Sequence, residues 1–413
     1  MRILFISRYF PDDPKTKVHG VYKRMGTFIE ALKGIADLDM LFYTSPDARY
    51  TPAQVSELVH SLGKHWNADI SLFLCPMSEY KNRTKLDKLT SFGKGICSIF
   101  NQRGYLELSG KRQVQAVEEC LDRKPDAIFA HRLPSMCPLI LTRKPLPPIF
   151  FDFDDIEHIV LSRSIARRNN LKGKLLYLLI PALRSGEIKA VNLAAETYVC
   201  SEKDRTYIAR EFHNTKAFVI PNSVNLPELH DPSPDPTLLF IGSDYGANLE
   251  AAEFLAKKIW PYIYPRVPDA KLIIAGIPPE KLNDSGLYGR GIEIAGFVAD
   301  LDSLYRRSRV IVTPLLVGGG TRFKIIEAAA YGKPIVSTAI GAEGIELSPG
   351  SEILIRDDTK RFAETCIELL KDSALCETIG KAARAKSESL YDRNAVVKLI
   401  NDRIVGNMKL TAS

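Results

Sequence analysis

Three consecutive glycines, Gly318, Gly319 and Gly320, stand just before two basic residues, Arg322 and Lys324, at the start of a predicted helix. Glycines let backbone N–H groups approach a ligand closely, and the first turn of a helix attracts anions. Cations at this end oppose the helix dipole, so helix stability gives no reason for them. The pattern therefore predicts a site for a ligand that carries phosphates.

Glu327 follows Lys324 by three residues and so lies on about the same face of the predicted helix. A carboxylate beside phosphates is repulsive unless it accepts hydrogen bonds, and ribose hydroxyls can donate them. The spacing therefore predicts a nucleotide, such as a nucleoside diphosphate. The alternative is an ion pair between Lys324 and Glu327 on a solvated helix face, which needs no ligand.

The segment of residues 318–347, GGGTRFKIIEAAAYGKPIVSTAIGAEGIEL, resembles the nucleotide-sugar segment of GT-B glycosyltransferases, specifically glycosyltransferase family 4 with a GGGTR loop. That family carries two glutamates, and Glu327 matches the second, which implies contact with the donor ribose. Gly319 stands at the position of the first, which in the family contacts the donor sugar. We expect the backbone N–H groups of Gly319, Gly320 and Thr321 to replace it.

Many family members hold the donor diphosphate with an arginine and a lysine in the first loop of the second domain. This chain has Gly242, Ser243 and Asn248 there, so Arg322 and Lys324 are expected to supply the charge. By resemblance, Gly20 faces the phosphates, and Phe297 and Val298 belong to the segment that reads the base. The expected donor-binding residues are Gly20, Gly242, Asn248, Phe297, Val298, Gly318, Gly319, Gly320, Thr321, Arg322, Lys324 and Glu327.

A second polar constellation, DFDDIEH at residues 152–158, ends a predicted strand. Asp152 and Asp154 lie on one strand face and could bind a metal, as in GT-A glycosyltransferases. The resemblance to GT-B enzymes implies instead a contact of His158 with the reacting sugar. We favour this contact, with Asp155 beside it, because the nucleotide signature lies in the other half of the chain. We therefore expect His158, Asp155 and Arg322 to be catalytic, and no metal or other cofactor. Capping of the next helix by Asp154 or Asp155 is the structural alternative.

These residues need strands and helices to position them, and short apolar runs alternate with amphipathic segments throughout. The predicted strands are residues 3–7, 37–43, 127–130, 148–153, 197–200, 218–220, 237–241, 271–275, 292–295, 310–314, 334–337 and 353–355. The alternation predicts an α/β protein whose parallel sheets bind ligands at the carboxyl ends of their strands. The resemblance implies GT-B architecture, with two Rossmann-like, doubly wound domains facing a central cleft.

The expected domain division lies near HDPSPDP, residues 230–236, just after IPNSVN, which resembles an element that ends the first domain in the family. We predict an acceptor-binding domain at residues 1–228 and a donor domain at residues 229–386. By resemblance, residues 387–413 form a helix that crosses back to the first domain. No GxGxxG follows a strand, which counts against a dinucleotide dehydrogenase.

Composition and cysteine usage indicate a globular cytoplasmic protein. The chain has 413 residues, 45% hydrophobic and 25% charged, with a net charge of +7. Its seven cysteines are scattered and form no CxxC pair, which favours a reducing compartment. The N-terminus reads as a buried strand, without the features of a signal peptide.

Basic residues concentrate in two segments, residues 81–112 and 163–189, the second around a run of leucines. This pattern suits peripheral contact with an anionic membrane, on the inner face of the membrane if the acceptor is lipid-linked. An ordinary solvated face above a core-facing leucine stripe remains the alternative. Nucleic acid is not expected, because no binding motif accompanies the charge.

The resemblance implies a hexosyltransferase-type enzyme that moves a sugar from a nucleotide-diphosphate sugar to the hydroxyl of a glycan or lipid-linked acceptor. It further implies retention of configuration and a role in polysaccharide or glycolipid assembly. Two alternatives stay open. One is a sugar-nucleotide isomerase of the 2-epimerase type, and the other is a non-catalytic nucleotide-sugar binding partner.

Overall fold

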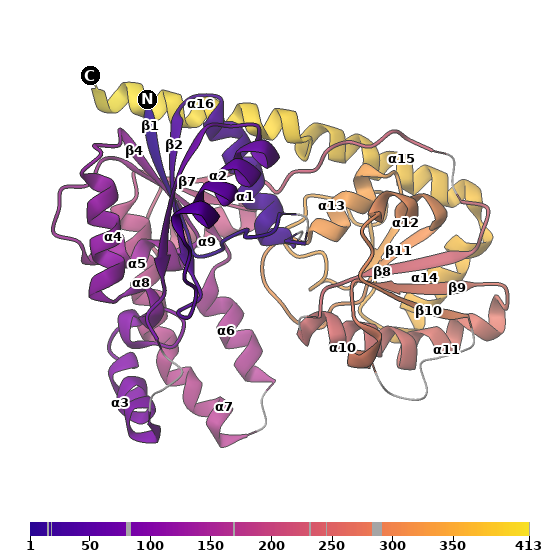
Figure 1. Ribbon diagram of the computed structural model, residues 1–413. Helices are drawn as coiled ribbons and strands as arrows, with labels where there is room; N and C mark the ends of the chain where they lie inside the picture. Colours follow the sequence, from indigo (N-terminus) through magenta and orange to yellow (C-terminus); the bar gives the residue numbers. More distant parts are fainter. Residues whose placement is uncertain are drawn as a thin grey trace. The chain divides into compact units, whose positions relative to one another are not determined.

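The computed structural model describes residues 1–412 except 15, 18, 80–83, 168–169, 231–232, 245 and 283–290. The chain divides into two compact units (Figure 1). Unit 1 comprises Met1–Ile220 and Val397–Ser413, and unit 2 comprises Pro221–Val396. The domain boundaries given above, after residues 228 and 386, stay a prediction.

Unit 1 is built on a parallel seven-stranded sheet with the order β3-β2-β1-β4-β5-β6-β7. Its strands are β1 (Arg2–Ser7), β2 (Asp37–Thr44), β3 (Ile70–Pro76), β4 (Ala127–His131), β5 (Ile149–Asp154), β6 (Glu196–Val199) and β7 (Ala217–Val219). Its helices are α1 (Gly20–Lys33), α2 (Pro52–Trp66), α3 (Lys85–Gly95), α4 (Lys111–Leu121), α5 (Leu133–Leu141), α6 (Glu157–Ala166), α7 (Leu171–Leu175), α8 (Ile180–Leu193) and α9 (Glu202–Glu211).

Strand β1 shows why this sheet is covered on both faces. Leu4 and Ile6 point into a buried cluster with residues of α4, α5 and α8. Phe5, between them, stacks on Phe129 of β4, which in turn contacts Phe28 of α1 on the opposite face. Alternate residues of a strand point to opposite faces, so a continuous apolar run is needed to bury both.

Unit 2 repeats this plan with a parallel six-stranded sheet of order β10-β9-β8-β11-β12-β13. Its strands are β8 (Thr237–Ile241), β9 (Lys271–Ala275), β10 (Ile292–Gly296), β11 (Val310–Thr313), β12 (Ile335–Ser337) and β13 (Leu354–Ile355). Its α-helices are α10 (Gly246–Phe254), α11 (Trp260–Ile263), α12 (Leu301–Arg307), α13 (Phe323–Ala330), α14 (Thr359–Lys371) and α15 (Ser373–Leu390). Helix α16 (Arg393–Ala412) begins in unit 2, and from Val397 onward its residues belong to unit 1.

The α/β class and the doubly wound arrangement of each sheet are confirmed. All predicted strands are present, with ends that shift by a residue or so. Strand β3 (ISLFLCP) was missed although five of its seven residues are apolar; it lies at the sheet edge, and most of its residues are only half-buried. No helix in the described part of the chain is both long and apolar enough to cross a membrane.

Each sheet has one point where the strand order reverses. This point lies between β1 and β4 in unit 1 and between β8 and β11 in unit 2. Loops leaving the carboxyl ends of two such neighbours diverge to opposite faces, which leaves room for a ligand between them. The predicted donor residues of unit 2 fall largely on the loops after β8 and β11.

Candidate functional site

Two loops of unit 2 meet at this reversal of strand order. The loop after β8 carries Gly242 and leads into α10, which contains Asn248, while the glycine loop after β11 leads into α13. Lys324 of α13 donates a hydrogen bond from Nζ to Oδ1 of Asn248 at 2.9 Å. A Cβ on Gly242 would lie 2.8 Å from Cβ of Asn248. Glycine at position 242 therefore leaves room for the side chain that Lys324 contacts.

Lys324 lies in an environment that opposes its charge. Its Nζ lies 4.6 Å from the ring centroid of Phe240, a contact that by itself favours the ammonium form. Burial, with the nearby positive charge of Arg322, lowers the pKa of Lys324 to about 7, and Glu327 opposes this shift. An anion bound beside Lys324 would favour its charged form. The unliganded site is therefore prepared for negative charge.

The glycine loop takes backbone conformations that only glycine adopts easily. Gly318 has φ 138° and Gly320 has φ 67°, in the left-handed region that side chains disfavour. Nη1 of Arg322 donates to the carbonyls of Gly319 and Gly320, the latter at 2.9 Å. Arg322 is the N-cap residue of α13 and folds back on the loop. Any contact of Arg322 with a diphosphate therefore requires this guanidinium to exchange loop carbonyls for phosphate oxygens.

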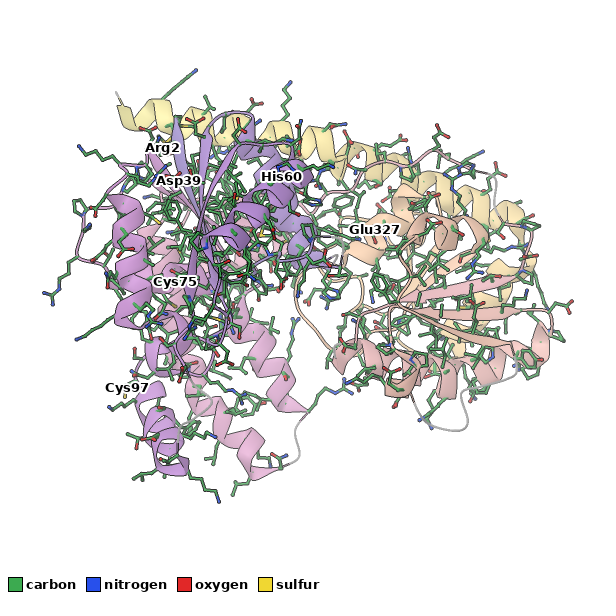
Figure 2. The ribbon with its side chains drawn as sticks, viewed as in Figure 1. Arg2, Asp39, His60, Cys75, Cys97 and Glu327 are labelled. Carbon is green, nitrogen blue, oxygen red and sulfur yellow. The ribbon has the colours of Figure 1, made fainter. Side chains whose placement is uncertain are left out.

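Glu327, labelled in Figure 2, lies on α13. A tyrosine from a different helix holds it. Oη of Tyr305 donates to Oε2 of Glu327 at 3.1 Å. Tyr305 stacks on Tyr331 with ring centroids 4.5 Å apart, which restricts its motion. Lys324 is hydrogen-bonded to Asn248, and Glu327 to Tyr305. Both residues of the ion pair considered as the alternative therefore have other partners.

Sequence reasoning missed two residues that support this site, Tyr305 and Asn222. Nδ2 of Asn222 donates to Oγ1 of Thr321 at 2.6 Å and so anchors the end of the glycine loop. Asn222 lies in the IPNSVN element, and that element gave the one sequence signal for its importance. Tyr305 gave no signal, because it is one apolar position of an ordinary amphipathic helix.

Three other predicted donor residues belong to other segments of the chain. Phe297, directly after β10, is 63% exposed, and Val298 packs partly against the core of unit 2. Gly20 is the first residue of α1 and belongs to unit 1. The structure does not join these three to the Lys324–Asn248 group, and their role in donor binding stays a prediction.

The aspartates after β5 in unit 1 bind arginines. Asp152 is fully buried and accepts hydrogen bonds from Nε of Arg24 at 2.9 Å and from Nη2 at 2.6 Å. Nη1 of Arg24 also donates to the carbonyl of Ile220 at 2.9 Å, which ties β5, α1 and the end of β7 together. Burial raises the pKa of Asp152 to about 6 against the opposing charge of Arg24.

Arg132, directly after β4, forms ion pairs with the neighbouring carboxylates of Asp154 and Asp155. Its guanidinium lies 3.4 Å from Asp154 and 2.5 Å from Asp155. No group of three or more His, Cys, Asp or Glu side chains within the described ranges could hold a metal ion. The metal alternative for Asp152 and Asp154 therefore has no geometric support. The capping alternative is wrong, because Ile156 is the N-cap residue of α6 and no side chain caps it.

His158 is buried within unit 1, and both of its ring nitrogens have partners. Nδ1 contacts Oε2 of Glu187, and Nε2 lies 2.9 Å from Oη of Tyr207. The backbone N–H of His158 also donates to Glu187 at 3.0 Å. These contacts fasten α6 to α8 and α9. Catalytic roles for His158 and Asp155 stay predictions that these contacts do not support, so we build no step on them.

Comparison with known proteins places these observations in a class. Residues 235–372, which include Asn248, Tyr305, Arg322, Lys324 and Glu327, match the family model described as glycosyl transferases group 1. A relative from Klebsiella pneumoniae, an uncharacterized 44.6 kDa protein in the cps region, is 28% identical over 172 residues. That match covers 40% of this chain and 44% of the relative, so the chain spans less than half the length of this curated relative.

Solved structures resemble the whole chain. Sucrose-phosphate synthase from Thermosynechococcus elongatus has a TM-score of 0.70 at 17% identity, with both chains covered fully. HepE from Anabaena, in complex with UDP and glucose, has a TM-score of 0.64 at 15% identity over 99% of each chain. TarM has a TM-score of 0.70 at 10% identity over 98% of each chain; another TarM structure, from S. aureus, contains UDP. The chain therefore has the GT-B glycosyltransferase fold, with two Rossmann-like units.

Proposed function

We propose that this protein is a glycosyltransferase that moves a sugar from a nucleotide-diphosphate sugar to an acceptor hydroxyl. The observation that carries the proposal is the 2.9 Å contact between Lys324 and Asn248, which joins the two loops at the strand reversal of unit 2. The group 1 match over residues 235–372 and the UDP complexes among similar structures support it.

Glu327, Lys324 and Arg322 each have a proposed role in holding the donor. Glu327, oriented by Tyr305, accepts hydrogen bonds from the ribose hydroxyls. Lys324 and Arg322 bind the diphosphate, together with backbone N–H groups of residues 318–321. Binding an anion returns the proton to Lys324, since nearby negative charge favours the ammonium form.

The chemical step leaves negative charge on the departing diphosphate. Preorganised donors aimed at that charge lower the barrier more than contacts made equally in the ground state. Lys324 is the proposed preorganised donor, and Arg322 joins it once its guanidinium exchanges loop carbonyls for phosphate oxygens. We therefore propose that transfer requires no metal. Membership of family 4, retention of configuration, hexosyl transfer, and polysaccharide or glycolipid assembly are further proposals that rest on the sequence resemblance.

The test is thermal unfolding with UDP, GDP, ADP, TDP and CMP, each with and without Mg²⁺. A ligand at roughly a hundred times its dissociation constant stabilises the folded state by about 2.7 kcal/mol. We expect one diphosphate to raise Tm independently of Mg²⁺. Glu327→Ala should weaken that binding by about 1–3 kcal/mol, the scale of a hydrogen bond to a charged group.

Two tyrosines provide a matched pair for this test. Tyr305→Phe removes the hydroxyl that bonds Glu327, whereas Tyr331→Phe removes a hydroxyl that bonds Asp302. Only Tyr305→Phe should reduce nucleotide affinity, by roughly threefold to tenfold, because it removes a hydrogen bond that orients Glu327 and no direct contact with the ligand. No shift with any nucleotide, or a shift that requires Mg²⁺ and is unchanged in Glu327→Ala, would refute the proposal.

A further inference from the structure

Two helical segments of unit 1 expose leucines to solvent. Helix α3 exposes Leu86 at 72% and Leu89 at 68%, and α7 exposes Leu171 at 75%. The 3-10 helix η3 (Leu176–Leu179), which follows α7, adds Leu178. Large apolar side chains that cluster outside the core mark a surface for interaction.

These segments belong to one surface because Gln102 holds them together. Its Nε2 donates to the carbonyl of Gly95, the last residue of α3, at 3.3 Å. The same atom donates to the carbonyl of Leu179, the last residue of η3, at 3.1 Å. Figure 1 shows α3 and α7 at the same end of unit 1. We call the exposed side of α3, α7 and η3 the leucine–lysine surface.

Positive charge is concentrated in the two stretches of sequence that contain α3, α7 and η3. Residues 80–106 and 161–186 contain twelve Lys and Arg against one Asp, a net charge of +11. The whole chain carries +7, so the remainder is net negative. Four exposed lysines on α3 and α7 form no ion pair with any residue that the structure describes: Lys85, Lys88, Lys94 and Lys174.

We propose that unit 1 docks on an anionic lipid bilayer through the leucine–lysine surface. Apolar side chains enter the boundary between headgroups and acyl chains, while lysines beside them contact anionic headgroups. A nucleic acid would use the charge but would leave the leucines in water. A second copy of the chain would place net positive surfaces against each other, which is repulsive. This inference goes beyond the proposed function and does not depend on it.

Vesicle flotation tests the proposal with the full chain. We expect binding to vesicles of phosphatidylcholine mixed with phosphatidylglycerol, and weak binding to phosphatidylcholine alone. Added salt should reduce the binding, because it screens exposed charge. Equal binding to both vesicles, or none to either, would overturn the proposal. The assay contains no nucleotide, so failure of the proposed donor site cannot be mistaken for failure of docking.

Charge variants separate this surface from net charge alone. The triple variant Lys85→Gln, Lys88→Gln and Lys174→Gln should weaken binding to the mixed vesicles about a hundredfold, from the usual contribution per lysine. The matched control replaces Lys258, Lys271 and Lys360, exposed lysines of unit 2, by glutamine. The control loses the same charge and should bind nearly as well as the wild type. Equal weakening in both triples would contradict a localised surface.

Cys97 reports insertion directly. It is the exposed cysteine just after α3, whereas the other six cysteines of the chain are buried, and it lies at this end of unit 1 (Figure 2). A polarity-sensitive fluorophore on Cys97 should shift to the blue on the mixed vesicles. Leu86→Ser, Leu89→Ser and Leu171→Ser together should abolish the shift while an unchanged melting profile shows that the protein is folded. A persistent shift in that variant would refute the assignment. The assignment would also be refuted if the wild type self-associated in light scattering and the variant lost this self-association but still bound the vesicles.

Discussion

At the scale of single residues, the site depends on the environment of Lys324. A buried lysine beside an arginine is costly to keep charged, and its lowered pKa reflects that cost. Asn248 accepts its hydrogen bond without supplying a charge. A bound diphosphate would place negative charge beside Lys324, which Asn248 does not supply.

Nucleotide affinity should therefore depend on pH with a defined sign. The diphosphate binds the protonated form of Lys324, whose pKa is about 7 in the free protein. Affinity should be highest below this pKa and fall by about tenfold per pH unit above it, because binding then requires proton uptake. Calorimetric titrations in buffers of different ionisation enthalpy measure both the affinity and the proton uptake.

Lys324→Arg is the control for this prediction, since arginine keeps its charge across the range. Its affinity for the same nucleotide should lose the dependence seen above pH 7 in the wild type. For the unliganded protein the sign is reversed. The folded state releases the proton at about pH 7 and the unfolded chain near 10.5, so the free energy of unfolding should rise between these values. A wild type and Lys324→Arg with identical pH profiles would contradict the assignment.

The sequence predicted that Lys324 and Glu327 belong to one site, because residues three positions apart in a helix lie on about the same face. It did not predict Tyr305 or Asn222, whose partners lie 22 and 99 positions away along the chain. It also left a metal site at Asp152 and Asp154 open as an alternative, because the arginines that bind them come from α1 and from the loop after β4. Contacts between distant segments are decided by packing, which local spacing does not reveal.

At the scale of elements, glycines decide how closely two helices of unit 2 approach. A Cβ on Gly380 of α15 would overlap the carbonyl oxygen of Gly332, which lies just after α13, and would stand 2.9 Å from its carbonyl carbon. Gly332 itself has φ 64°, a left-handed conformation that favours glycine at this position too. Close contact between α13 and α15 therefore requires glycine at position 380.

Gly380→Ala should destabilise the protein by about 1–3 kcal/mol, the usual cost of overpacking. Gly406 of α16 is a matched control, because it is also helical but a Cβ there meets nothing within 4 Å. Gly406→Ala should instead stabilise by up to about 1 kcal/mol through helix propensity. Urea denaturation of both variants measures the difference, and equal effects of the two substitutions would contradict this packing argument.

At the scale of the whole molecule, the chain forms two units with separate cores. Helix α16 contributes residues to both units. Ile400 and Ile404 of this helix are fully buried. Arg403 pairs with Glu196 of β6 and lies 3.5 Å from the ring centroid of Phe218 in β7. The last turns of the chain are therefore part of unit 1, although its other residues end at Ile220.

Removal of residues 397–413 should destabilise unit 1 while leaving the nucleotide response of unit 2. Loss of two buried isoleucines alone costs about 3–6 kcal/mol. Differential scanning calorimetry should show a lower Tm for one transition and an unchanged ligand-dependent shift in the other. Deletion of residues 409–413 alone is the control, because Ile400, Arg403 and Ile404 remain. A full deletion that melts like this control would show that α16 contributes little to unit 1.

The sequence by itself determined the strands, the parallel doubly wound class, and the glycine loop with its charges, because periodicity and backbone preferences act over a few residues. Only the tertiary structure decided that Asn248 meets Lys324, that Tyr305 orients Glu327, and that arginines bind the aspartates after β5. It also decided that α3 and α7 form one surface and that α16 completes unit 1. These contacts depend on how crossovers bring distant segments together, and burial sets their strength.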